Sequence, residues 1–169
     1  TLNSENDIVQ AENAVNALKE TDYEQLEHLE TLKKARAVYD DLSAKKDAKR
    51  AIAAIDKISE MISLDDKFTI QFARKVYDSC TSDAQKYVTN YDKLLTAENS
   101  FSELKIEKVI TSILSIGTVT LKSQTDVVNA KFLFNNLTPN EQSKVSNSGV
   151  LFNAIETLSK LQDEKRAQD

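Results

Sequence analysis

The chain has 169 residues, of which 40% are hydrophobic and 29% are charged, with 22 lysines and arginines against 27 aspartates and glutamates. This apolar content is enough to bury a core or two, which excludes a disordered chain. The net charge of −5 argues against a nucleic acid or an anionic membrane as the main partner, because both require a clustered positive surface.

Residues that break helices are scarce, since only two glycines and one proline occur in the whole chain. Sheet proteins need more turn residues than this, so the composition predicts a chain that is nearly all helix. No apolar run approaches the roughly 20 residues of a membrane span, and no signal segment begins the chain. We therefore expect a soluble protein with no membrane span, and a piece of a longer one.

The first predicted helix lies in TLNSENDIVQAENAVNAL at 1–18. This stretch recurs as TLKSQTDVVNAKFLFNNL at 120–137, where eight of the eighteen positions are identical. A fainter copy at 62–80 is related to 119–137 by an offset of 57 residues. The chain is therefore organised by an internal repeat, which contains this helix three times.

A second helix follows each copy of the first. Its apolar pattern at 26–42 recurs at 88–104, offset by 62 residues, and at 145–161, offset by a further 57. The apolar residues recur at i, i+3 or i+4, and i+7, which is the stripe of a bundle helix.

A third helix is predicted upstream of the later two copies. AIAAIDKISEM at 51–61 recurs as VITSILSIGTV at 109–119, offset by 58 residues, and no equivalent precedes Thr1. The repeat unit is therefore three helices long, and such a unit most simply closes as a three-helix bundle.

The predicted organisation follows from these offsets. A partial repeat at 1–44 begins in the middle of a unit and holds only the second and third helices. Complete three-helix bundles are predicted at 45–104 and 105–163, and a polar tail at 164–169. The partial repeat leaves an apolar stripe open, which we expect either to bind a partner or to be weakly ordered.

Neither 28–61 nor 90–116 contains a glycine, a proline or a turn cluster. The last helix of one bundle is therefore predicted to run continuously into the first helix of the next. A shared helix of roughly 30 residues would be about 45 Å long. The predicted fold class is all-α, with tandem three-helix bundles in an elongated array.

Helix boundaries carry capping signals. TPNE at 138–141 combines a hydroxyl N-cap, a proline at the first helical position and a glutamate three residues after the cap. Ser4, Ser123 and Thr21 are predicted to cap other helices in the same manner.

The two glycines also mark predicted helix boundaries. Gly117 is predicted to end a helix in the left-handed conformation. Gly149 is predicted to mark a break that splits the last helix into 139–145 and about 148–162.

A longer pattern at 116–158 carries a family resemblance. It reads Ile-Gly-Thr-Val-Thr-Leu-x-Ser, then Val-Val-x-Ala-x-x-x-Phe-Asn-x-Leu-Thr-Pro-x-Glu-Gln, and ends in Leu-x-x-Ala-x-x-x-Leu. This pattern resembles the triple-helical-bundle repeats of Gram-positive S-layer and other large cell-surface proteins, which are similar in plan to spectrin repeats. The middle copy departs from it, with Ser59 in place of the glycine and Cys80 in place of a leucine.

The resemblance implies a non-catalytic structural spacer or lattice-forming module, extracellular and at a bacterial cell surface. Its implied partners are neighbouring repeats of the same parent protein, with a cell-wall polymer or another surface protein as further candidates. An intracellular spectrin-like scaffold is a more remote alternative. No catalytic residues and no cofactor are implied.

Few residues suggest chemistry. Cys80 is the only cysteine and occupies an apolar repeat position, so we interpret it as a small buried hydrophobe and not as a reactive thiol. His28 aligns with Asn90 and Asn147 at a helix break, which favours local capping over metal binding. The acidic clusters lack the glycine and ligand spacing of a calcium loop. No catalytic constellation is visible, and the chain is predicted not to be an enzyme.

Binding remains an alternative function. Tyr87 and Tyr91 are four residues apart and align with polar residues of the next repeat, so they could form an exposed pair that stacks on a sugar or a partner side chain. Packing within a short leading helix or against a neighbouring bundle is the favoured interpretation, and Phe132 is a similar case. The basic run AKKDAKR at 44–50 is interpreted as a solvated helix face. The alternative to the spacer is an adhesion or wall-polymer-binding module that uses these tyrosines or this run.

Overall fold

The structure is a computed structural model that describes residues 1–168, apart from the side chains of residues 20, 21 and 25. It is 77% helical, and the described residues form no strand, which confirms the all-α prediction. The chain divides into two compact units. The first unit contains Thr1–Glu60 and Phe68–Leu95, and the second contains Met61–Lys67 and the residues from Thr96 onward. The repeat boundaries predicted from the sequence stay predictions.

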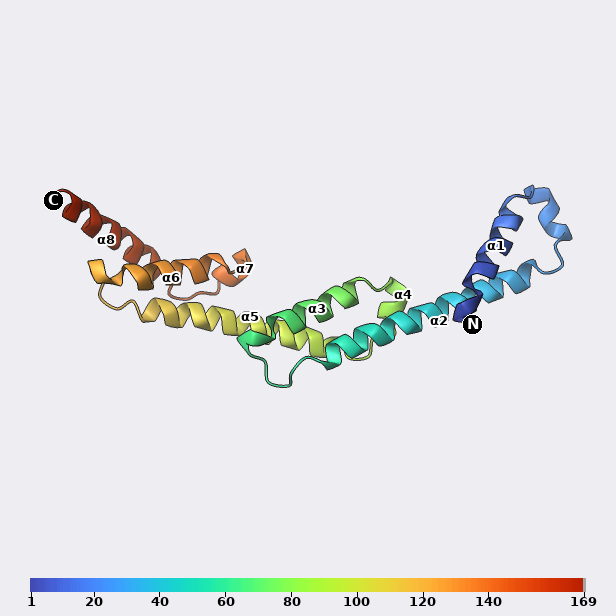
Figure 1. Ribbon diagram of the computed structural model, residues 1–169, viewed down its shortest axis with the longest axis horizontal. Coiled ribbons are helices and arrows are strands. Elements are labelled where there is room, and N and C mark those ends of the chain that lie inside the picture. The colour runs from blue at the N-terminus through green and yellow to red at the C-terminus, as the bar shows by residue number, and fades with distance from the viewer. Residues whose placement is uncertain (169) are drawn as a thin grey trace. The chain divides into compact units, whose positions relative to one another are not determined.

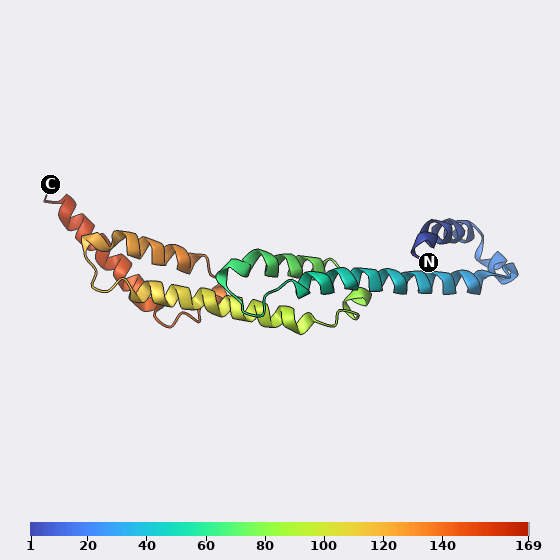
Figure 2. The same cartoon turned by 60° about the horizontal axis from the view of Figure 1, so that its bottom comes forward.

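The first unit is built around one long helix. That helix is α2 (Leu29–Asp56), and α1 packs against it. In both views, α1 lies beside the part of α2 that follows the turn between them (Figures 1 and 2). The other elements, in chain order, are η1 (Leu2–Ser4), α1 (Glu5–Asn16), η2 (Glu20–Gln25), α3 (Lys67–Asp78), α4 (Ser82–Gln85) and the start of α5 (Tyr91–Leu114).

The second unit has one apolar core, to which three helices contribute. After the short η3 (Leu64–Asp66), its elements are the rest of α5, η4 (Leu121–Ser123), α6 (Gln124–Asn135), α7 (Pro139–Gln142) and α8 (Ser148–Arg166). The α6 and α8 helices pack against each other. The buried core residues come from α5, α6, α8 and the turns between them: Ile106, Val109, Ile113, Ile116, Val127, Ala130, Phe134, Leu137, Val145, Leu151, Ala154 and Leu158.

The two long helices are continuous, as the absence of breakers predicts. The α2 helix runs for 28 residues and α5 for 24, each without interruption. The α2 helix ends at Asp56, before the end of the apolar pattern at Met61. Its buried side includes four alanines, at positions 44, 48, 51 and 54, which allow close helix packing.

The capping predictions are partly confirmed. Thr138 accepts a hydrogen bond from the Glu141 amide, and the Glu141 carboxylate accepts one from the Thr138 amide, which completes the predicted capping box. Ser4 and Ser123 were predicted as caps and are not, because neither makes a side-chain cap hydrogen bond. The side chain of Thr21 lies outside the described residues.

The cap lies three residues earlier in two of the three copies. Ser63 and Thr120 have extended backbones, and their hydroxyls accept hydrogen bonds from the amides two residues later. The side chain of the third residue, Asp66 or Ser123, then accepts from the cap amide. A 3₁₀ turn thus precedes both α3 and α6, and the cap lies at the start of this turn.

The two glycines behave differently. Gly117 has a φ of 58°, so the predicted left-handed helix end is confirmed. The predicted break in the last helix is confirmed, because α7 ends at Gln142 and α8 begins at Ser148, so that Gly149 is the second residue of α8. Asn147 is the N-cap residue of α8.

Candidate functional site

Tyr87 and Tyr91 do not share a helix. Tyr87 lies in the turn after α4, and Tyr91 is the first residue of α5. The Tyr91 ring stacks on Tyr77 of α3 with 4.3 Å between ring centroids, and its hydroxyl accepts a hydrogen bond from Arg74. The Arg74 guanidinium carbon lies 5.4 Å from the Tyr91 centroid. The exposed pair, which was the alternative interpretation, is therefore not formed, and Tyr91 packs inside the unit.

Tyr87 remains at the surface, with 40% of its area exposed. Its hydroxyl donates a hydrogen bond to Asp41 of α2, and the Lys45 ammonium lies 5.2 Å from its ring centroid. The hydrogen bond to Asp41, together with burial, raises the pKa of Tyr87. Asp41 also accepts a 2.8 Å hydrogen bond from Lys45. These contacts fix the ring against α2.

The fixed ring forms one wall of a groove, here called the Tyr87 groove, of about 460 Å³. Three lysines of the basic run lie along it, at positions 45, 46 and 49. All three are exposed, which confirms the interpretation of this run as a solvated face. Within the described part of the chain, Lys46 and Lys49 form no ion pair. The apolar part of the lining comes from Leu2, Leu42, Ala48 and Ile52.

The basic run and Tyr87 are separate features of the sequence, and in the fold they line the same groove. Tyr87 lies 38 to 42 residues after the three lysines in the chain and on another element, so no local pattern could join them. Leu2 and Leu42 were visible only as repeated apolar positions. Their exposure gives the groove its apolar edge.

Phe132 belongs to the second unit and is 62% exposed on α6. Val128 lies one turn before it and Leu121 two turns before that, and both are exposed. Val128 and Phe132 lie on one side of α6, and Leu121 belongs to the preceding η4. Phe132 is thus available for a contact at the surface of the second unit.

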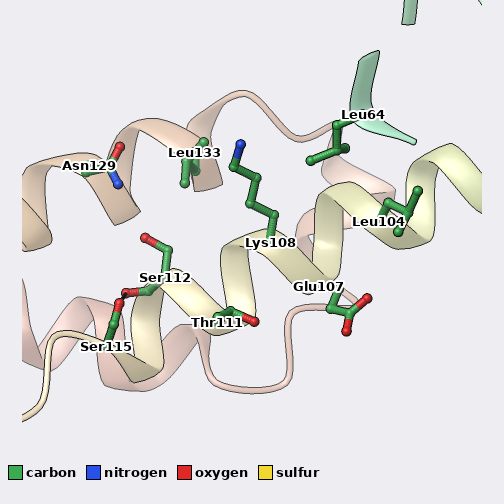
Figure 3. Close-up of a pocket in the computed structure, with 9 residues that line it drawn as sticks. All are labelled: Leu64, Leu104, Glu107, Lys108, Thr111, Ser112, Ser115, Asn129 and Leu133. Carbon is green, nitrogen blue, oxygen red and sulfur yellow. Dashed lines mark hydrogen bonds between the residues drawn. The ribbon is translucent and has the colours of Figure 1, made fainter. Parts of the chain in front are cut away.

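A second groove, of about 530 Å³, lies between α5 and α6 (Figure 3). Asn129 and Leu133 of α6 face Lys108 and Ser112 of α5 across it. The Ser115 hydroxyl donates a 2.9 Å hydrogen bond to the Ser112 carbonyl oxygen and is occupied within its own helix. The lining is mixed, since Leu64, Leu104 and Leu133 lie beside the polar side chains.

Among the described residues, Glu141 is the carboxylate whose pKa is shifted most strongly. It is 6% exposed and accepts hydrogen bonds from Lys105 at 2.6 Å, Ser102 at 2.7 Å and the Thr138 amide at 2.9 Å. Burial acts to raise the pKa of Glu141, but these donors outweigh it and lower the pKa to about 2. A carboxyl group with a pKa of about 2 has no proton to donate near neutral pH and is a weak base, and three donors occupy its oxygens, so we interpret this cluster as structural.

Cys80 is half-buried, and its thiol donates to the Val76 carbonyl oxygen at 3.4 Å. Burial raises the pKa of the Cys80 thiol, which disfavours the reactive thiolate. The structure thus agrees with a packing role, although the side chain is less buried than expected.

The local capping expected for His28 is wrong. His28 is exposed and makes no side-chain cap hydrogen bond. The aligned asparagines act across helices instead: Asn90 donates to the Ile52 carbonyl oxygen at 3.1 Å and Asn147 to the Ile110 carbonyl oxygen at 3.0 Å. Ile52 and Ile110 are equivalent in the repeat, and no equivalent of them accompanies His28.

Among the described residues, no group of three or more histidine, cysteine, aspartate or glutamate side chains could hold a metal ion. No described helix is both long enough and apolar enough to cross a membrane. Comparisons with protein-family models, with curated proteins and with solved structures found no match to this chain.

Proposed function

We propose that the chain is a non-catalytic structural spacer of a bacterial cell-surface or S-layer-like protein, built as tandem three-helix bundles. In this proposal, α2 and α5 are each the last helix of one bundle and the first helix of the next. The location at a Gram-positive cell surface is taken from the resemblance of 116–158 to repeats of such proteins. Neighbouring repeats of the same parent protein are the proposed partners.

The observation that carries the proposal is the double use of α5. Leu94 near its start is fully buried in the first unit, and Ile113 near its end is buried in the core of the second. No interruption separates them in the 24-residue helix. A helix that supplies two cores transmits spacing without a flexible linker, which is what a spacer requires.

The pattern of repetition also supports a spacer. Core positions keep their character, as in Leu94 with Leu151 and Ala97 with Ala154, which are all buried. Surface positions change, as in Tyr87 with Lys144. This pattern, in which core residues recur and surface residues do not, is expected of a protein whose function depends on its fold and not on binding one ligand.

Small-angle X-ray scattering on the purified chain tests the proposal. An elongated particle is expected, with a radius of gyration clearly above that of a globular protein of the same length. A globular chain of 169 residues would have a radius of gyration of about 15 Å. A measured value near this figure would contradict the tandem arrangement.

The Tyr87 groove favours one alternative function, binding of an anionic cell-wall polymer. Its three exposed lysines would attract phosphate groups, and its aromatic wall offers a stacking surface. Titration calorimetry with a polyglycerol phosphate at low and high salt tests this alternative. Binding that is salt-dependent and lost in Lys46→Gln/Lys49→Gln, but kept in the matched double variant Lys122→Gln/Lys131→Gln, would support it. No binding at low salt would exclude it.

A further inference from the structure

The first repeat differs from the third in what covers its helices. The α1 helix corresponds to α6, and the first half of α2 corresponds to α8, both at a constant offset of 119 residues. In the second unit the residues of α6 and α8 at the core positions are buried. Ala130 is 0% exposed and Leu137 is 6% exposed.

The equivalent residues of the first repeat are accessible. Ala11, which corresponds to Ala130, is exposed, and Leu18, which corresponds to Leu137, is 42% exposed. Leu32 and Ala35 are half-buried, whereas their counterparts in α8 are buried. We call this surface the open α1–α2 face; it consists of Ala11, Val15, Leu18, Leu32 and Ala35.

The chain itself contains two examples of what covers this kind of face. In the second unit, Ile106, Val109, Ile113 and Ile116 are buried in the core with α6 and α8. In the first unit, the equivalent residues of α2 and the turn after it are also buried: Ala48, Ala51, Ile55 and Ile58. Both segments place an apolar residue at i, i+3, i+7 and i+10, which is one face of a helix.

The open α1–α2 face is also preformed. Arg36 donates to Glu12 at 2.7 Å, and this ion pair joins α1 to α2. This ion pair holds the two helices together, although Ala11, Leu32 and Ala35 are less buried than their counterparts in α6 and α8.

We propose that the open α1–α2 face binds one amphipathic helix that carries β-branched or small apolar residues at i, i+3, i+7 and i+10. This inference rests on the three-helix plan of the proposed function. It adds that the first repeat is completed by a partner helix of the same type as residues 105–116, docked on Ala11, Leu32 and Ala35.

The probe is a synthetic peptide with the sequence of residues 102–118, SELKIEKVITSILSIGT, added to the full ¹⁵N-labelled chain. Amide chemical-shift changes are expected to cluster in α1 and the first half of α2. A control peptide with asparagine at Val109 and Ile113 should cause no such changes, because it lacks the central apolar pair.

Two matched variants locate the contact. Ala11→Arg places a long charged side chain on the open face and should weaken peptide binding at least tenfold. Since Ala11 is already exposed, the free chain should keep its helicity. Ala37→Arg makes the same change at a position equivalent to the exposed Glu156, and it should bind the peptide like the unsubstituted chain.

Three outcomes would overturn the inference. These are no shift changes at millimolar peptide, changes confined to residues 96–168, or a self-associated chain whose dimer is lost in Ala11→Arg. The last result would assign the face to a second copy of the chain. A failure here is distinct from a failure of the spacer proposal, because a missing peptide site would leave an elongated scattering profile unchanged.

Discussion

Glu141 and its repeat equivalent show how one packing position can be filled in two ways. In the second unit, the buried Glu141 carboxylate receives hydrogen bonds from Ser102 and Lys105 of α5. In the first unit the equivalent residue is Ala84 of α4, which is fully buried, and α4 packs against the alanine-rich side of α2. The buried Ala84 needs no hydrogen-bond partner. The buried Glu141 needs its donors, because a buried carboxylate without a partner lowers the stability of the fold.

Glu141→Gln should therefore destabilise the chain. Each pKa unit corresponds to about 1.4 kcal/mol, so the shift of the Glu141 pKa from 4.5 to about 2 corresponds to roughly 3 kcal/mol for the ionised form. Urea unfolding at pH 7 should show a loss of about 2–3 kcal/mol. Glu103→Gln, which removes an exposed carboxylate of the same helix that supplies Lys105, should change stability by less than about 0.5 kcal/mol.

The pH dependence of stability gives an independent check on Glu141. Its pKa is lower in the folded state than the ordinary 4.5, so its contribution is fully present above pH 4.5 and is lost as the pH falls toward 2. The unfolding free energy of the unsubstituted chain should fall through this window. In Glu141→Gln the fall should be smaller, and equal slopes in the two proteins would contradict the assigned role.

At the scale of single elements, the two glycines form a natural matched pair. Gly117 has a positive φ of 58°, and Gly149 is helical; a methyl group added at either position would meet no atom within 4 Å. Both positions therefore have room for an alanine side chain, and they differ in backbone conformation.

Gly117→Ala should cost about 1–2 kcal/mol, because a side chain disfavours the left-handed conformation. Gly149→Ala should instead stabilise the chain by about 0.5–1 kcal/mol, since alanine is the better helix former. Thermal unfolding followed by circular dichroism measures both effects. If both substitutions shift the unfolding temperature in the same direction, the left-handed backbone of Gly117 does not require a glycine.

Features with a local cause were predictable from the sequence. The helical content, the continuity of α2 and α5, the capping box at Thr138 and the left-handed Gly117 all follow from nearby residue types. The caps at Ser4 and Ser123 were misplaced for a local reason too, because the 3₁₀ turn that precedes each helix carries no signal of its own.

Features that depend on tertiary packing were not predictable. Tyr87 and Tyr91 were placed on one helix, but they lie on different elements because the chain turns at residues 88–90, where neither glycine nor proline occurs. The side chain of Asn147 donates to the Ile110 carbonyl oxygen, 37 residues earlier in the chain, and no local pattern indicates this contact. The Tyr87 groove was missed for the same reason, since its lining joins η1, α2 and a distant turn.

At the scale of the whole molecule, the proposed spacer function depends on the continuity of α5. The boundary that divides the chain into two compact units falls within this helix, between Leu95 and Thr96. An uninterrupted helix resists bending because each amide is hydrogen-bonded to the carbonyl four residues earlier. The proposal therefore makes α5 the element that sets the spacing between the units.

Asn99→Pro tests this role, because Asn99 is exposed near the middle of α5. Proline removes the amide hydrogen bond at that position and clashes with the carbonyl of Leu95, at a cost of about 3 kcal/mol. Spin labels at Lys86→Cys and Lys160→Cys, in a Cys80→Ser background, report the distance between the two units by double electron–electron resonance.

A narrow distance distribution is expected for the control Asn99→Ala, and a markedly broader one for Asn99→Pro. Circular dichroism should show that the proline variant keeps most of its helicity, because each unit retains its own buried residues on either side of the substitution. If both variants give equally narrow distributions, contacts outside α5 hold the units in place. If the alanine control is itself broad, the helix does not fix their spacing, and the chain is a flexible tether and not a spacer.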